Sequence, residues 1–203
     1  MTWRHMVTQL GRMKHYIIAS CAVFFVGLVL GFGFSGSYQH FIEMQMKALQ
    51  ELAKSAASKS HPQMSLFWLI FWNNVSTSFK IIGLGVFFGV LPLFFLLANG
   101  LLLGYVASDQ ASKQSVMLFI KGILPHGVIE IPAIILAAAL GIRLGALVLK
   151  SFFRFFNPAK DQRTEKELRP FIASLVPFGL LLVVALFVAA VIESTITYWL
   201  VKM

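Results

Sequence analysis

The chain has 203 residues, of which 58% are hydrophobic and only 12% charged, and its formal net charge is +9. Soluble domains carry about 25% charged residues, so this composition excludes an ordinary soluble domain and predicts an integral membrane protein. The single cysteine excludes a disulfide framework and a cysteine-based metal site. We attribute the positive charge to cytoplasmic loops and expect no nucleic-acid partner.

The first apolar segment covers residues 16–34, close to the ~20 residues that a helix needs to cross a bilayer. Arg4, Arg12 and Lys14 precede it, which predicts a cytoplasmic N-terminus. Residues 37–63 then repeat apolar side chains at spacings of three and four, the pattern of an amphipathic helix. We expect an extracytoplasmic connector here that is solvated or lies at the interface, with a partner-docking helix as the alternative.

Residues 64–149 form a glycine-rich apolar core in which we expect three crossings, at about 68–90, 92–107 and 125–149. The middle one is short for a transmembrane helix. One crossing with re-entrant or broken helices is therefore the alternative, since irregular backbone is tolerated at membrane depth when protein surrounds it.

The segment 150–170 carries six basic residues against three acidic ones and is predicted to be a cytoplasmic loop. A last span over 171–201 would place the C-terminus outside the cell. The whole chain, 1–203, is thus predicted to be one membrane domain: an all-α, compact, polytopic bundle of about five transmembrane helices in the lipid bilayer of a bacterial cell membrane.

Four G-x-x-x-G pairs predict close helix packing, because two glycines on one helix face let a neighbouring backbone approach. A homodimer is a further expectation, and the spacing does not divide the contacts between one chain and two. The pairs are Gly27 and Gly31, Gly85 and Gly89, Gly100 and Gly104, and Gly141 and Gly145.

The stretch ILPHGVIEIPA (123–133) places a histidine and a glutamate in an apolar segment. Pro125 suits the first turn of a helix, which would set His126 and Glu130 on one face. We expect a buried polar network that also includes Asn73, Asn74 and Asn99.

Three roles for His126 and Glu130 stay open: a structural hydrogen-bond node, a metal or proton site, and part of a transport pathway. A divalent metal such as zinc would need further ligands from elsewhere, because two residues do not complete its coordination. The zinc-protease, Walker and nucleophile-elbow motifs are absent from the sequence, so we expect no enzymatic activity and no catalytic residues.

The order Asn73-Asn74, Asn99-Gly100-x-x-x-Gly104 and Pro125-His126-Gly127-x-x-Glu130 resembles the stage II sporulation protein M family over roughly 68–149. The resemblance implies a membrane protein that works with sporulation proteins D and P in peptidoglycan remodelling, septal thinning and forespore engulfment. It implies a scaffold whose partners cut the wall. Because the family also has members in organisms that do not sporulate, a small ion- or metal-coupled transporter using His126 and Glu130 is the alternative.

Overall fold

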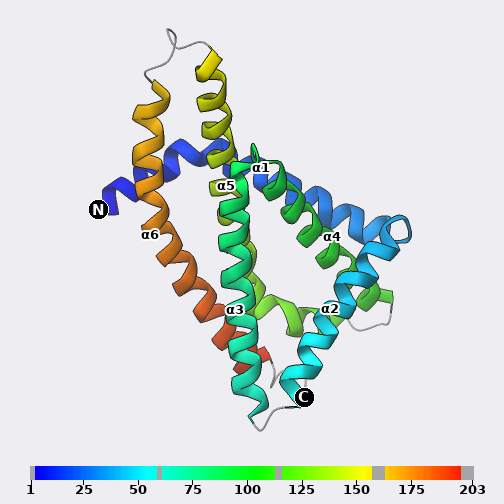
Figure 1. Cartoon of the computed structure of the whole chain (residues 1–203). Coiled ribbons are helices and arrows are strands. Elements are labelled where there is room, and N and C mark those ends of the chain that lie inside the picture. Colours follow the sequence, from blue (N-terminus) through cyan, green and yellow to red (C-terminus); the bar gives the residue numbers. More distant parts are fainter. Residues whose placement is uncertain (1–2, 59–60, 113–115, 157–162, 198–203) are drawn as a thin grey trace.

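The structure is a computed structural model that describes residues 3–58, 61–112, 116–156 and 163–197. The regular secondary structure of these residues is entirely helical, which confirms the predicted all-α membrane bundle (Figure 1). In chain order the elements are α1 (Trp3–Gly33), η1 (Ser35–Tyr38), α2 (Gln39–Ala57), α3 (Pro62–Gly83), η2 (Leu84–Val86), α4 (Val90–Ser112), α5 (Val116–Phe156), α6 (Arg163–Ile192) and the π-helical turn η4 (Glu193–Thr197).

Four helical stretches in the described part of the chain are long and apolar enough to cross a membrane: Met6–Gly33, Val90–Ser112, Gly127–Phe153 and Glu167–Thr195. They belong to α1, α4, α5 and α6. The remaining predicted crossing corresponds to α3, whose 22 residues span about 33 Å, also long enough for a bilayer. Asn73, Asn74 and Lys80 make α3 less apolar than the other four helices.

Contacts between the helices give their relative directions. In α1 and α4 the neighbours advance together, from Gly27 beside Leu97 to Gly31 beside Leu101, so these two helices are parallel. The helices α3 and α5 are parallel as well, because Asn74 bonds to Glu130 and Ile81 lies beside Gly141. The helix α6 runs antiparallel to α5, with Glu167 beside Lys150 and Phe171 beside Arg143. Five alternating crossings would have these directions.

Glycines bring α1 and α4 into backbone contact. A Cβ at Gly27 or Gly31 would collide with the backbone of α4, and a Cβ at Gly100 or Gly104 would collide with that of α1. All four collisions would be closer than the 3.0 Å that real Cβ atoms respect. Figure 1 shows this pair leaving the group of α3, α5 and α6 obliquely, with α2 returning from the end of α1 to the start of α3.

The turn between α3 and α4 lies on the glycine-lined face of α5. A Cβ at Gly85 would collide with the carbonyl group of Gly141, and one at Gly145 with the backbone of Phe88 and Gly89. Phe88 and Gly89 have positive φ angles of 57° and 77°. Glycine adopts such angles without strain, whereas an aromatic residue does so at a cost. The close fit against α5 holds this strained turn in place.

The helix α5 corrects the prediction that Pro125 begins a helix. It starts at Val116 and continues through both Pro125 and Pro132. A proline inside a helix removes one hydrogen bond and clashes with the preceding turn, so it bends the helix. Figure 1 shows the bend: the N-terminal part of α5, in light green, runs across the molecule before the helix turns along α3.

Other predicted boundaries also move. The short crossing expected at 92–107 is a 23-residue helix, α4, and the crossing expected at 68–90 ends at Gly83. The expected loop 150–170 is largely helical, because α5 continues to Phe156 and α6 begins at Arg163. Within the connector at 37–63, α2 forms as predicted and packs against α3.

Candidate functional site

The polar site centres on a hydrogen bond between α3 and α5. Asn74 lies near the middle of α3, and its Nδ2 donates to Oε1 of Glu130 at 2.5 Å. Both side chains are half-buried. Glu130 lies between the two prolines of α5, at the bend that brings this part of the helix against α3. A carboxyl group in an apolar bundle needs a donor, and Asn74 supplies one.

A second carboxyl group, Glu193, belongs to this site, although the sequence pattern did not assign it there. It opens η4 at the end of α6, is half-buried and lies within electrostatic reach of Glu130. Because α6 is antiparallel to α5, the end of one helix returns to the beginning of the other. The site therefore combines one amide and two carboxyl groups from three helices, an arrangement that can hold a proton or a cation.

Two of the predicted network residues have other hydrogen-bond partners. Asn99 donates from Nδ2 to the carbonyl oxygen of Phe95, 2.8 Å away on its own helix. Asn73 is exposed; its Nδ2 donates to Oδ1 of Asn74 at 3.5 Å, and its backbone oxygen accepts from Oγ of Ser76 at 3.1 Å. The structure thus brings Asn74 and Glu130 together, ties Asn99 to α4, and leaves Asn73 on the outer surface of α3.

His126 precedes Glu130 by one turn of α5, and its side chain lies outside the described part of the structure. Among the described residues, no group of three or more His, Cys, Asp and Glu is arranged to hold a metal ion. Metal binding by His126 and Glu130 therefore stays a hypothesis.

A second polar cluster, centred on Arg143, joins α1, α5 and α6. Arg143 is only 5% exposed, and its Cζ lies 4.7 Å from the ring centroid of Phe171. One of its Nη atoms donates to the backbone oxygen of Gln9 at 3.5 Å. An arginine over an aromatic ring is a cation–π contact, which strengthens away from water. This cluster fastens the start of α1 to the other two helices.

The chain is similar to known proteins along most of its length. The family described as Stage II sporulation protein M matches residues 20–198. The chain is also similar to two uncharacterized proteins of Methanocaldococcus jannaschii. One, MJ0706, is 26% identical over 195 residues, which cover 94% of this chain and 85% of that protein. The other, MJ0793, is 24% identical over 190 residues, which cover 93% and 99% respectively.

No solved structure matches the chain. The family match extends over nearly the whole sequence, from within α1 to just past η4, and its range includes Asn74, Glu130 and Glu193. The chain therefore belongs to the stage II sporulation protein M family, a family of sporulation-related membrane proteins.

Proposed function

We propose that this protein is a non-enzymatic membrane scaffold of a peptidoglycan-remodelling complex in endospore formation. Its partners, corresponding to sporulation proteins D and P, would cut the wall during septal thinning and engulfment of the forespore. Family membership supports the setting. The observation that carries the scaffold role is that the half-buried Glu130 is bonded to Asn74 of a neighbouring helix.

The packing also favours a rigid anchor over a moving machine. Eight glycines place backbones in direct contact, between α1 and α4 and between α5 and the turn after α3. Close-packed interfaces of this kind resist sliding, because any shift brings backbone atoms into collision. All eight have partners within the chain, so the expected homodimer would have to use another surface.

A direct test of the scaffold role is co-purification from cells that make the full chain with an affinity tag. We expect wall-remodelling proteins to co-purify with the wild type and with Val176→Leu, a change on the exposed face of α6. Gly104→Leu, which drives a side chain into the backbone of α1, should lose them. Equal recovery of these proteins from cells without the tagged chain would contradict the proposal.

A second candidate function is coupling to a proton or cation, and the pairing of Glu130 with Glu193 favours it. Two carboxyl groups within electrostatic reach of each other in an apolar bundle repel when both are charged, and a shared cation relieves that repulsion. Vesicles containing the purified protein would then show ion or proton flux that Glu130→Gln abolishes. Flux equal to that of empty vesicles would exclude transport.

Metal binding at this site can be tested separately. Metal analysis of the purified wild type and of His126→Ala should differ by about one equivalent if His126 is a ligand. Equal content in both would remove His126 from any metal site.

We also propose the orientation in the membrane. Positive charge near the N-terminus and in 150–170 favours a cytoplasmic location for both. The alternating helix directions would then put the C-terminus outside the cell.

A further inference from the structure

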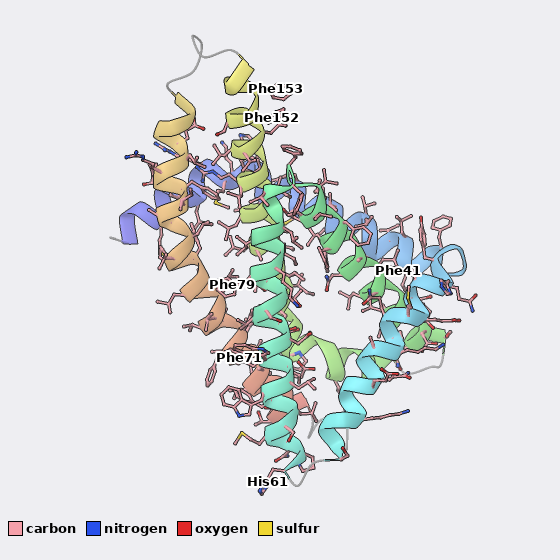
Figure 2. The ribbon with its side chains drawn as sticks, viewed as in Figure 1. Phe41, His61, Phe71, Phe79, Phe152 and Phe153 are labelled. Atoms are coloured by element: carbon pink, nitrogen blue, oxygen red, sulfur yellow. The ribbon has the colours of Figure 1, made fainter. Side chains whose placement is uncertain are left out.

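The exposed face of α3 differs from the exposed faces of the other spans. Outward-facing residues in the apolar part of α6 are hydrophobic, including Val176, Leu180 and Val184, as lipid contact requires. In contrast, α3 presents a polar stripe, defined as Asn73, Ser76, Lys80 and Gly83. Ser76 is half-buried and the other three residues are exposed, and the exposed rings of Trp68 and Trp72 lie on the same helix. In Figure 1, and in Figure 2 with side chains drawn, α3 runs along the front of the molecule, and no other helix of the described chain lies over it.

The spacing of the stripe is that of one helix face. Its members follow one another at intervals of three, four and three residues, so they form a row along α3. Nothing lies within 4 Å of a Cβ built on Gly83. Small residues and hydrogen-bonding side chains are typical of contacts between transmembrane helices, because they permit close approach and supply polar bonds.

The distance of each residue from the ends of α3 decides which member of the polar stripe cannot be accommodated by lipid. Lys80 lies three residues from the end of α3 and can extend its amine to the interface. Asn73 lies eleven residues from Pro62 and ten from Gly83, about 15 Å from either end of the helix. Its short side chain cannot reach water, and its bond to Asn74 is long at 3.5 Å.

We propose that the polar stripe of α3 is the docking surface for a transmembrane helix of a partner protein. This proposal rests on the scaffold function and deepens it by naming the surface. The partner helix would present small residues opposite Gly83 and Ser76, a hydrogen-bonding side chain at the depth of Asn73, and a carboxylate near Lys80.

Charge favours a different protein over a second copy of this chain. A two-fold dimer with its axis along the membrane normal places identical residues at the same depth. Docking α3 on α3 would then bring Lys80 close to Lys80 of the other copy, and like charges repel. A helix with an acidic residue at that level turns the same lysine into an attractive contact.

The test is photo-cross-linking of the full chain in native membranes, with p-benzoylphenylalanine replacing Trp72. The same replacement at Val176 on α6 is the matched control, since both side chains are more than 60% exposed. We expect Trp72 to give an adduct whose cross-linked peptide lies in a transmembrane segment of another protein. Val176 should give no such adduct.

When Asn73→Leu is combined with the photo-cross-linker at Trp72, the yield of the adduct should fall roughly threefold to tenfold. This is the range that one hydrogen bond between membrane helices implies. Lys80→Leu, measured separately, should also reduce the yield. The proposal is overturned by an adduct between two copies, by an adduct with residues 198–203 of the same chain, by equal adducts at Trp72 and Val176, or by insensitivity to both substitutions.

The scaffold function and the docking surface on α3 can fail separately. If wall-remodelling proteins co-purify with the chain and cross-link through α6 or α2, the scaffold stands and the docking surface is wrong. If no such protein co-purifies, the scaffold itself fails.

Discussion

At the scale of single residues, Asn74 and Glu130 account for how an apolar bundle tolerates a carboxyl group. The amide of Asn74 donates to Glu130 across the interface of α3 and α5. Its neighbour Asn73 has the same side chain but faces outward. The adjacent pair therefore provides its own comparison between an inward and an outward asparagine.

Asn74→Leu should lower the free energy of unfolding by about 1–3 kcal/mol, because it leaves a partly buried carboxyl group without its donor. Asn73→Leu should change it by less than about 0.5 kcal/mol, as is usual for exposed positions. Unfolding of the reconstituted protein by a denaturing detergent measures both values. Equal losses of unfolding free energy in the two variants would show that the hydrogen bond from Asn74 to Glu130 does not contribute to stability.

Arg143 and Phe171 should be energetically coupled. A double-mutant cycle with Arg143→Met and Phe171→Leu isolates their interaction, because each change removes the cation–π contact while keeping an apolar side chain. We expect a coupling of about 0.5–2 kcal/mol in the same unfolding assay. Simple additivity of the two changes would mean that the contact is a consequence of packing only.

Sequence patterns predicted some residues of the site and missed others, for physical reasons. The i, i+4 spacing was enough to select Glu130. Glu193 was missed because only the antiparallel packing of α6 on α5 brings it near, and a sequence does not state that register. Asn99 was assigned to the network because a buried amide needs a partner, yet its own helix supplies one at Phe95.

At the scale of elements, glycine spacing was informative about helix packing, whereas proline did not tell where α5 begins. G-x-x-x-G spacing depends only on helical periodicity, so it indicated correctly that the bundle packs through glycine. Proline is compatible with two readings, a first turn or an internal bend, and the local sequence around Pro125 does not separate them. In the structure Pro125 lies inside the helix, because α5 already begins at Val116.

The glycine contacts predict opposite effects on stability for two glycine-to-alanine substitutions. Gly104→Ala should destabilise the protein by about 1–3 kcal/mol, because its Cβ would overlap the carbonyl group of Leu28. Gly11→Ala, in the open part of α1, should stabilise it by about 0.5–1 kcal/mol, the usual gain inside a helix. Thermal denaturation of the two variants checks this. A stabilised Gly104→Ala would contradict backbone contact between α1 and α4.

At the scale of the whole molecule, helix directions and charge distribution predict a topology. In a Cys21→Ala background, single cysteines at Ser58 and Ser112 should react with a membrane-impermeant maleimide on intact cells. Cysteines at Arg12 and Lys150 should react only after the membrane is opened, because both lie at the basic ends of their helices, which the charge distribution predicts to be cytoplasmic. Labelling of Ser58 and Lys150 from the same side would require an even number of crossings between them.

We propose that this protein acts as a scaffold and that the role of Glu130 is structural. The most direct measurement is the function of Glu130→Gln in cells whose own copy has been removed, scored by wall remodelling and by recovery of the co-purified proteins. Glutamine can still accept the bond from Asn74 but cannot carry the charge or the proton of a carboxyl group. We expect Glu130→Gln to preserve both readouts. A variant that assembles normally and yet fails to support remodelling would contradict this expectation and assign the chemistry to the carboxyl group.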